Sequence, residues 1–476
     1  MSIHTEIARH VLAPSFDRIR GTGAMRRLAH LEKSQWWSRT QIEEQQSFHL
    51  QNVLSHAYAH VPYYRQVLDE RGLKPGDIRT IEDLRRLPAL RKADIRAHFA
   101  RLLSTDVPHG QLRAGWSGGT TGERLSFYST RQERFTYAYA RWALTLGWTG
   151  VQLGERHVSI RQQLEGARPG SLGRLSQRLQ QLTRVDTMKV REENLASLVC
   201  LLQRSRPRTV FSYPSALALI ASYARSHELA CPHIPSVCLG GELMHERQRT
   251  VLEDVFGSVP FIRYGSNELH EVSGQCEVRD GLHILAEDFI IEVVDDEGFP
   301  VPEGERGLLL ITSLHNHGMP FIRYAPGDIG ALRIDTCSCG RGLPLMDARI
   351  GRTRDYLVST AGTRVAALVV DVAPLLPPGV VQYQLVQNGP DRLLLRAVPE
   401  NDTTDSTWFP ARQAVASSLS ARMGADVSVE LQLVDHIDMN LSGKRLSFIS
   451  NLDSSGRSAD AATDSTAGRR LDAEAP

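Results

Sequence analysis

Within the first 110 residues, apolar positions recur at helical spacing. The clearest stretch predicts an amphipathic helix over Thr40–Ala59, whose apolar side chains gather on one face. These side chains are Ile42, Phe48, Leu50, Val53, Leu54 and Ala57. The helix should end before Val61-Pro62, because the residue before a proline is pushed out of the α region. We therefore predict a helical lead-in over residues 1–110.

From residue 111 to 350, runs typical of buried strands alternate with helical stretches. One example is a strand predicted at Thr209–Ser212, then a helix over Ser215–Ser226 and a second strand at Ser236–Leu239. This strand–helix–strand rhythm indicates largely parallel sheets. The expected fold class is α/β, with one large domain of several subdomains.

After Gly281 the pattern changes to short strands. They are predicted at 283–285, 289–294 and 307–312, and turns rich in Asp, Glu and Gly join them. This arrangement indicates an antiparallel lobe that completes the large domain.

A separate unit is predicted beyond residue 352. Apolar strands at Leu393–Leu395 and Val427–Val429, with a helix near 411–423, are enough for a small α+β domain. Residues 453–476 have almost no large apolar side chains and are expected to be disordered. The predicted organisation is a large domain over 1–352, a small mobile domain over 353–452 and a tail over 453–476.

The composition is that of a soluble globular protein. Of 476 residues, 41% are hydrophobic and 23% are charged, which excludes wholesale disorder, collagen and coiled coil. A formal net charge of +1 gives no global attraction to nucleic acid or anionic membranes. The longest apolar run, Val365–Val381, is broken by prolines, and Met1–Leu12 has no secretory signal pattern. We expect a cytoplasmic protein without stable membrane insertion that binds small molecules. The sequence does not fix the oligomeric state, and a homodimer stays open.

The segment Trp116–Arg124 combines three glycines with three hydroxyl side chains. Its central residues are Ser117, Gly118, Gly119, Thr120, Thr121 and Gly122. Glycine permits close backbone approach, and N–H groups together with hydroxyls can wrap a polyphosphate. Taken alone, the segment is also compatible with a polar hairpin turn. It matches neither a Walker loop nor a dinucleotide fingerprint.

Four further segments follow in a fixed order. They are Gly240-Gly241-Glu242, Tyr264-Gly265-Ser266-Asn267-Glu268, Arg323-Tyr324-Ala325-Pro326-Gly327-Asp328 and Gly351-Arg352-Thr353-Arg354-Asp355, with Ser442-Gly443-Lys444-Arg445 near the end. Together with the loop, they resemble the motif series of the adenylate-forming enzymes, the acyl-CoA synthetase and adenylation-domain superfamily. The stretch His60-Val61-Pro62-Tyr63-Tyr64-Arg65 resembles the phenylacetate–coenzyme A ligase branch, especially its capsular-polysaccharide-associated relatives.

The resemblance implies where a nucleotide would bind. The loop from Ser117 to Gly122 would hold the β- and γ-phosphates of ATP. Gly241, Glu242 and Tyr264 would form the adenine slot, with the tyrosine ring stacked on the base.

The same resemblance implies the ribose contacts and the catalytic groups. Asp328 and Arg352 would bind the ribose, and Glu268 would hold Mg²⁺. Lys444, on a small domain that swings about a hinge near Asp355, would reach the substrate carboxylate and the bridging oxygen. Glu268 and Lys444 are therefore the predicted catalytic residues, because attack of a carboxylate on the α-phosphorus of ATP builds negative charge. Taken singly, each residue is also compatible with an ordinary turn or surface position.

The implied activity is ATP-dependent formation of an acyl-adenylate from an organic acid, aromatic if the named branch is a guide. Transfer to a thiol would follow, with coenzyme A as the expected acceptor. Ser359–Val365 does not match the Arg-Gly-Val-Asn-Val-Phe-Pro stretch of phenylacetate ligases, which leaves the acceptor open. One alternative passes an acyl or aminoacyl group to a carrier or a cell-envelope polysaccharide precursor. Another is a catalytically silent nucleotide-binding partner in polysaccharide biosynthesis.

Three cysteines and a histidine are candidate ligands of a structural Zn²⁺. Cys337 and Cys339 form a compact pair, and Cys276 and His283 lie upstream. Such a set satisfies the tetrahedral preference of Zn²⁺ if the strands of 281–312 fold back beside 331–340. Reduced, partly exposed cysteines are the alternative, because one residue between two cysteine ligands is a less usual spacing.

Overall fold

The structure is a computed structural model that describes residues 3–117, 125–162, 174–175, 177–178, 180–352, 356–360, 364–366, 372–377, 379–399, 405–423, 426–440 and 443–452. The chain divides into two compact units. The first contains Met1–Met244, Gln248–Ile350 and Asn440–Lys444. The second contains His245–Arg247, Gly351–Met439 and Arg445–Pro476. The predicted hinge residue Asp355 and the predicted tail over 453–476 lie outside the described residues.

The helices of the described residues are α1 (Ile3–Ile7), α2 (Ala13–Arg20), α3 (Ala24–Ser34), α4 (Arg39–His60), α5 (Pro62–Glu70), α6 (Lys92–Ala97), α7 (Ala138–Trp148), α9 (Glu192–Ser205), α10 (Pro214–Ser226), α11 (Glu246–Phe256) and α12 (Asp405–Met423). The strands up to residue 313 are β1 (Leu112–Trp116), β2 (Ser126–Thr130), β3 (His157–Arg161), β4 (Leu182–Asp186), β5 (Thr209–Ser212), β6 (Ser236–Gly240), β7 (Phe261–Ser266), β8 (His270–Gly274), β9 (Leu282–Ile284), β10 (Phe289–Val294) and β11 (Gly307–Ser313). The later strands are β12 (Asp328–Gly330), β13 (Leu332–Arg333), β14 (Leu345–Met346), β15 (Gly351–Arg352), β16 (Tyr356–Val358), β17 (Arg364–Ala366), β18 (Val380–Gly389), β19 (Arg392–Pro399), β20 (Ser428–Leu433) and β21 (Phe448–Ser450).

The helical lead-in begins the first unit, and α4 closely follows its predicted limits. Ser38 starts the helix with a capping box, because its hydroxyl accepts from the N–H of Gln41 while the Gln41 side chain accepts from the N–H of Ser38. The helix ends at His60, Val61 after it is extended, and Pro62 opens α5, where a missing N–H costs nothing. No helix of the described residues combines the length and the apolar character needed to cross a membrane.

A large mixed sheet dominates the first unit. Among the described residues its strand order is β13-β14-β9-β8-β7-β6-β5-β3-β4. Strands β4, β3, β5, β6 and β7 run parallel, whereas β8, β9, β14 and β13 continue the sheet with antiparallel pairs. The expectation of an α/β fold with largely parallel pairing is confirmed for this part of the chain.

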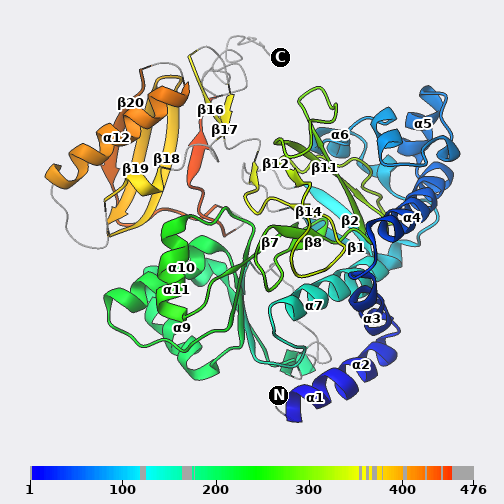
Figure 1. Cartoon of the computed structure of the whole chain (residues 1–476), viewed down its shortest axis with the longest axis horizontal. Coiled ribbons are helices and arrows are strands. Elements are labelled where there is room, and N and C mark those ends of the chain that lie inside the picture. The colour runs from blue at the N-terminus through cyan, green and yellow to red at the C-terminus, as the bar shows by residue number, and fades with distance from the viewer. Residues whose placement is uncertain are drawn as a thin grey trace, which may run out of the picture. The chain divides into compact units, whose positions relative to one another are not determined.

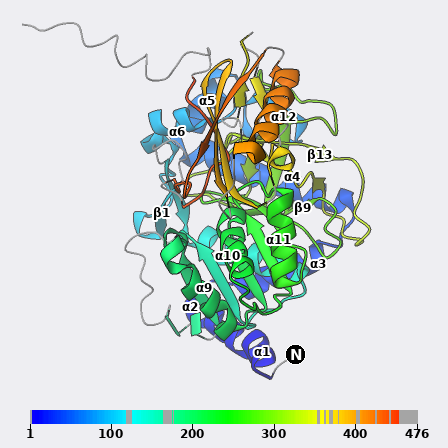
Figure 2. The same cartoon turned by 90° about the vertical axis from the view of Figure 1, so that its left-hand side faces the viewer.

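Both faces of this sheet are covered, because successive side chains of a strand point to opposite faces and those of β5 and β6 are all buried. Val210 and Val237 point to a core formed with α9, α10 and α11. Phe211 and Cys238 belong to the opposite core, which contains residues of α7 and the lead-in helices. Figure 1 shows α9, α10 and α11 grouped beside the sheet, and Figure 2 shows the same three helices facing the viewer.

An antiparallel lobe is present, but one predicted member belongs elsewhere. Strands β10 and β11 pair antiparallel, and β11 pairs with β12. The strand around His283 does not join them. It is β9, which pairs with β8 and with β14, where His283 lies opposite Leu345. The reason is a tight turn at Leu285, whose carbonyl accepts from the N–H of Phe289 and so redirects the chain.

The second unit contains a sheet with the order β20-β19-β18-β21. The pair β18–β19 is antiparallel, while β19–β20 and β18–β21 are parallel. Leu393 and Leu395 of β19 pack with Val415 and Leu419 of α12 in a separate core. Helix α12 begins at Asp405 rather than near 411, because Pro410 lies inside the helix and does not mark its start.

Candidate active site

Two tyrosines and two carboxylates join the central motifs. The hydroxyl of Tyr264, on β7, donates to Asp328 Oδ2 at 2.8 Å. The hydroxyl of Tyr324 donates to Glu268 Oε1, also at 2.8 Å. Each segment therefore supplies one tyrosine and one carboxylate, and the two segments are cross-linked by reciprocal hydrogen bonds. The predicted magnesium ligand and the predicted ribose ligand consequently lie in one site.

The base of the glycine–hydroxyl loop adjoins the same site. The side-chain amide of Asn267 donates to the carbonyl of Trp116 at 2.9 Å. The N–H of Leu125 donates to the hydroxyl of Ser117 at 3.0 Å, and the N–H of Ser117 donates to the carbonyl of Leu125 at 2.8 Å. These bonds close the loop beside the turn that carries Glu268. The remaining predicted phosphate ligands, Gly118, Gly119, Thr120, Thr121 and Gly122, lie outside the described residues.

The third motif follows β6 and needs its glycines. A β-carbon on Gly240 would lie 2.7 Å from the carbonyl oxygen of Arg263, and Gly241 has a φ of +83°. Glu242 Oε2 accepts from the N–H of Ser215 at 3.0 Å, at the start of α10. A carboxylate is favourable there, because a helix N-terminus presents free N–H groups and a positive dipole end.

Lys444 lies in the segment Asn440–Lys444, which belongs to the first unit, although the prediction placed it in the small domain. Its ammonium Nζ donates to the carbonyl of Gly241 at 2.7 Å and lies 5.3 Å from the centre of the Tyr213 ring. The structure therefore brings the predicted lysine to the predicted adenine motif. Arg352 lies in β15 of the second unit, and its side chain is outside the described residues.

Burial changes the pKa of Tyr324 beside Glu268, whose own side chain is almost completely buried. Burial, together with the neighbouring Glu268 carboxylate, raises the pKa of Tyr324 well above its usual range. Tyr324 therefore keeps its proton and remains a hydrogen-bond donor. The second oxygen of Glu268 accepts no hydrogen bond from the described residues, so it is available to a cation.

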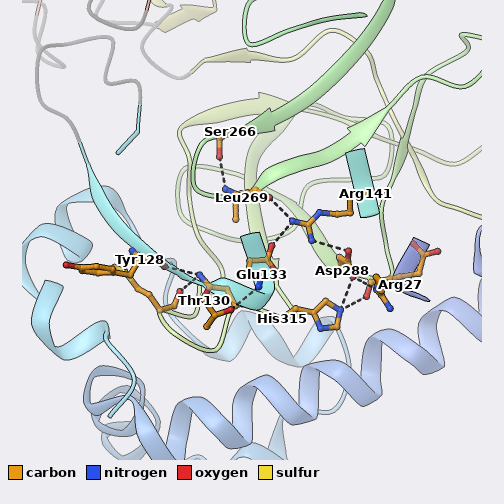
Figure 3. A network of polar contacts seen from close by, with 12 residues as sticks. Arg27, Tyr128, Thr130, Glu133, Arg141, Ser266, Leu269, Asp288 and His315 are labelled. Atoms are coloured by element: carbon orange, nitrogen blue, oxygen red, sulfur yellow. Dashed lines mark hydrogen bonds and ion pairs between the residues drawn. The ribbon is translucent and has the colours of Figure 1, made fainter. Parts of the chain in front are cut away.

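A buried arginine holds the turn after Glu268. Arg141, on α7, donates to Asp288 at 3.0 Å, to Glu133 at 2.6 Å and to the carbonyl of Leu269 at 3.3 Å. Figure 3 shows the three acceptors around the guanidinium. Because Leu269 directly follows Glu268, these bonds fix the backbone that carries the carboxylate.

The same network reaches the hairpin that carries the loop. The N–H of Glu133 donates to the hydroxyl of Thr130 at 3.0 Å, at the end of β2 (Figure 3). Asp288 also binds Arg27 and lies 2.9 Å from His315 Nε2. Burial alone would raise the pKa of Asp288, but the adjacent Arg27, His315 and Arg141 lower it well below its usual range. Asp288 is therefore an ionised centre of the network.

Glu287 differs from its neighbour Asp288. Its side chain is fully buried, it accepts from the hydroxyl of Ser34 at 2.6 Å, and its second oxygen has no hydrogen-bond partner among the described residues. Burial raises the pKa of Glu287 from 4.5 to about 7. Between pH 4.5 and about pH 7, the folded protein binds the proton of Glu287 more tightly than the unfolded chain does. The free energy of unfolding should therefore fall as pH rises through this range.

We expect Glu287→Gln to remove this loss of folding stability at high pH. At pH 8 the variant should be more stable than the wild type by roughly 2–4 kcal/mol, while at pH 4 the two should be similar. Urea unfolding across this pH range is the measurement. Parallel stability profiles for the two proteins would show that Glu287 is ionised in the folded state at neutral pH.

The four candidate zinc ligands also meet in the first unit. Cys276 Sγ lies 3.7 Å from Cys337 Sγ, and Cys339 Sγ lies 3.3 Å from His283 Nε2. All four ligand atoms lie within 4.8 Å of one another. Tetrahedral Zn–S bonds place two sulfurs about 3.8 Å apart, whereas a disulfide requires about 2.05 Å. The four ligands come together because β9 pairs with β14. This pairing places His283 opposite Leu345, in the strand that follows Cys337 and Cys339.

Sequence reasoning did not single out three residues of the site. They are Asn267, Tyr324 and Arg141. Asn267 and Tyr324 belong to the predicted motifs, but the motifs assign no role to either residue. One signal was available, because a tyrosine precedes an acidic residue by four positions in both Tyr264–Glu268 and Tyr324–Asp328. Arg141 carries no comparable signal, since its role depends on partners from distant segments.

Comparisons with known proteins agree on one group of enzymes. A family model described as the CapK C-terminal domain matches residues 357–451. The phenylacetate-coenzyme A ligase of Thermus thermophilus is 32% identical over 357 residues, which cover 73% of this chain and 78% of that protein. The phenylacetate-coenzyme A ligase of Escherichia coli is 29% identical over 335 residues, covering 67% of this chain and 72% of that protein.

Solved structures show the same fold. A 2-hydroxyisobutyryl-CoA ligase in the postadenylation state, in complex with R3-HIB-AMP, has a TM-score of 0.70 at 22% identity, over 86% of this chain and 89% of that one. An anthranilate CoA ligase in complex with anthranoyl-AMP has a TM-score of 0.52 at 15% identity, over 72% of this chain and 66% of that one.

Proposed function

Because this chain belongs to the phenylacetate–coenzyme A ligase family, we propose that it joins an organic acid to coenzyme A with the use of ATP. In the first step the carboxylate attacks the α-phosphorus, so that acyl-adenylate forms and pyrophosphate leaves. In the second step the thiol attacks the acyl carbon, so that a thioester forms and AMP and a proton are released. The observation that carries this proposal is the reciprocal pairing of Tyr264 with Asp328 and of Tyr324 with Glu268.

The nucleotide would lie along this pair of segments. Asp328, held by Tyr264, would accept from the ribose hydroxyls, and the Tyr264 ring would stack on adenine. Gly241 and Glu242 would border the base, and the loop that begins at Ser117 would hold the phosphates. Arg352 would brace the ribose.

Glu268 is the residue that would hold Mg²⁺. A carboxylate oxygen suits this hard cation, which usually binds one or two carboxylates together with substrate phosphates. One oxygen of Glu268 is occupied by the Tyr324 hydroxyl, and the other accepts no hydrogen bond from the part of the chain that the structure describes. When bound, the ion would neutralise charge on the phosphates. Arg141 would hold Glu268 in position through its hydrogen bond to the carbonyl of Leu269.

Lys444 would act on the reacting carboxylate. Its ammonium would draw the negative substrate to the α-phosphorus and would stabilise the charge that develops on the bridging oxygen. In the structure this ammonium donates to the Gly241 carbonyl, which keeps it next to the nucleotide motifs.

The experiment that tests the function is a panel of aliphatic and aromatic acids, with pyrophosphate release measured for each. Release that depends on an added acid establishes adenylation, and no release with any acid favours a silent nucleotide-binding protein. The acid that works best is then incubated with coenzyme A, and thioester is measured by mass spectrometry. Adenylation without thioester would direct the search to a carrier or a polysaccharide precursor as acceptor.

A structural Zn²⁺ is the second part of the proposal. Cys276, His283, Cys337 and Cys339 supply four ligand atoms within 4.8 Å, and four protein ligands leave no open position for catalysis. The ion would join β8, β9 and the β13–β14 connection.

We expect the purified protein to contain about one tightly bound zinc per chain once exchangeable metal is removed, and Cys337→Ser to lose most of it. Loss of the ion should also lower the thermal midpoint, because metal binding contributes to folding. Cys238→Ser is the matched control, since Cys238 is also buried but lies on β6 outside the cluster. Full zinc content in Cys337→Ser, measured by plasma mass spectrometry, would contradict the assignment.

A further inference from the structure

A second cluster of metal-binding side chains lies at the C-terminal end of α4, apart from the candidate active site. His56 and His60 stand four residues apart, so they share one face of the helix. Asp106 comes from the loop 103–108. The ligand atoms of these three residues all lie within 4.8 Å of one another.

The hydrogen bonds of His56 fix which ring nitrogen can bind a cation. Its Nε2 lies 2.9 Å from the carbonyl oxygen of His317. A carbonyl only accepts, so Nε2 carries a proton, and the hydroxyl of Ser104 also lies 3.2 Å from it. In the neutral ring, Nδ1 then carries the lone pair. Nδ1 lies 4.0 Å from Asp106 Oδ2. Nδ1 of His56 and the carboxylate of Asp106 are thus two acceptors that face each other. In a metal-bound histidine, the ring nitrogen that does not bind the metal usually donates to a carbonyl or a carboxylate.

Backbone hydrogen bonds of the two preceding residues hold Asp106 in place. The N–H of Thr105 donates to the carbonyl of His60 at 2.9 Å, and the N–H of Ser104 donates to the carbonyl of Gly318 at 3.0 Å. The loop is therefore anchored at Ser104 and Thr105, independently of any ion. Such preorganisation favours binding, because the carboxylate does not have to be ordered when the cation arrives.

We propose that His56, His60 and Asp106 bind a divalent transition-metal ion, with Zn²⁺ as the expected ion. Two imidazoles and one carboxylate suit Zn²⁺, whereas Mg²⁺ and Ca²⁺ prefer oxygen ligands throughout. Three protein ligands leave a fourth position for water. His56 and His60 are partly exposed and Asp106 is exposed, so the ion exchanges with solution. It ties the end of α4 to the loop 103–108.

Titration of Zn²⁺ into the full chain tests this site. The protein is first equilibrated with a mild chelator that removes exchangeable metal, and uptake is followed by calorimetry. The wild type should bind one exchangeable ion, and His60→Ala should weaken binding by at least about 10- to 100-fold. His10→Ala is the control. His10 is an exposed helix residue whose Nε2 lies 3.3 Å from the Glu6 carboxylate, its single ion-pair partner within the described ranges.

Cobalt separates this site from the cysteine cluster. Co²⁺ at His56, His60 and Asp106 should give no thiolate charge-transfer absorption, and Asp106→Asn should weaken its binding as His60→Ala does. The inference fails if the wild type takes up no exchangeable ion. It also fails if His60→Ala and Asp106→Asn bind as the wild type does, or if the cobalt spectrum shows thiolate ligation.

Discussion

Lys444→Ala is expected to slow pyrophosphate release by about 10²- to 10³-fold, the effect of removing one preorganised charge-stabilising group. The ammonium lies 2.7 Å from the Gly241 carbonyl, and only five of the 55 basic residues are lysines. No other lysine follows Lys189 in the sequence. Binding of ATP should persist, because adenine, ribose and phosphates have other partners. Thioester formation from a supplied acyl-adenylate should also persist.

Two further variants make the Lys444 result specific. Lys444→Arg keeps the charge but replaces a compact ammonium with a planar fork, so it should restore only part of the rate. Lys74→Ala should have no effect, because Lys74 is an exposed residue that binds Asp69 and the Tyr58 hydroxyl. Unchanged pyrophosphate release in Lys444→Ala would refute the catalytic role of this lysine.

Strand positions could be predicted from the sequence, but strand partners could not. The strands at Thr209–Ser212 and Phe289–Val294 have the predicted limits, because turn residues bound their apolar runs. The pairing of β9 with β14 joins His283 to Leu345, which lies far along the chain. Local pattern contains no information on such a partner. The same pairing brings the cysteine and histidine ligands together, so the cluster depended on topology that periodicity does not reveal.

In the candidate site, too, some residues could be predicted from the sequence and others could not. The order of the motifs identified the family, which the similarity to phenylacetate-coenzyme A ligases confirms. It also predicted roles for Tyr264, Glu268 and Asp328, and the structure joins the segments that carry them by hydrogen bonds. The supporting groups were not identified as such. Arg141 supports the site because, from α7, it donates to the carbonyl of Leu269, next to Glu268. A single arginine in an apolar helix gives no indication of its hydrogen-bond partners.

Glu268→Gln should lower the rate of pyrophosphate release on the order of 10²-fold and should raise the Mg²⁺ concentration needed for half-maximal rate. The amide oxygen can still accept from the Tyr324 hydroxyl, so the local structure is retained while the negative charge is lost. Mg²⁺ binds carboxylates far better than neutral amides in a site of this kind, because it dehydrates reluctantly. The measurement is the initial rate over a series of Mg²⁺ concentrations at saturating acid.

Asp328→Asn is the matched comparison for Glu268→Gln. Each carboxylate accepts a tyrosine hydroxyl at 2.8 Å, and the amide oxygen of either variant can keep that bond. Their roles differ, and Asp328→Asn should raise the KM for ATP while the dependence on Mg²⁺ stays that of the wild type. If both variants changed the two parameters equally, the substitutions would be acting through the shared structure of the cross-linked segments. Separate effects would show that one carboxylate serves the cation and the other the ribose.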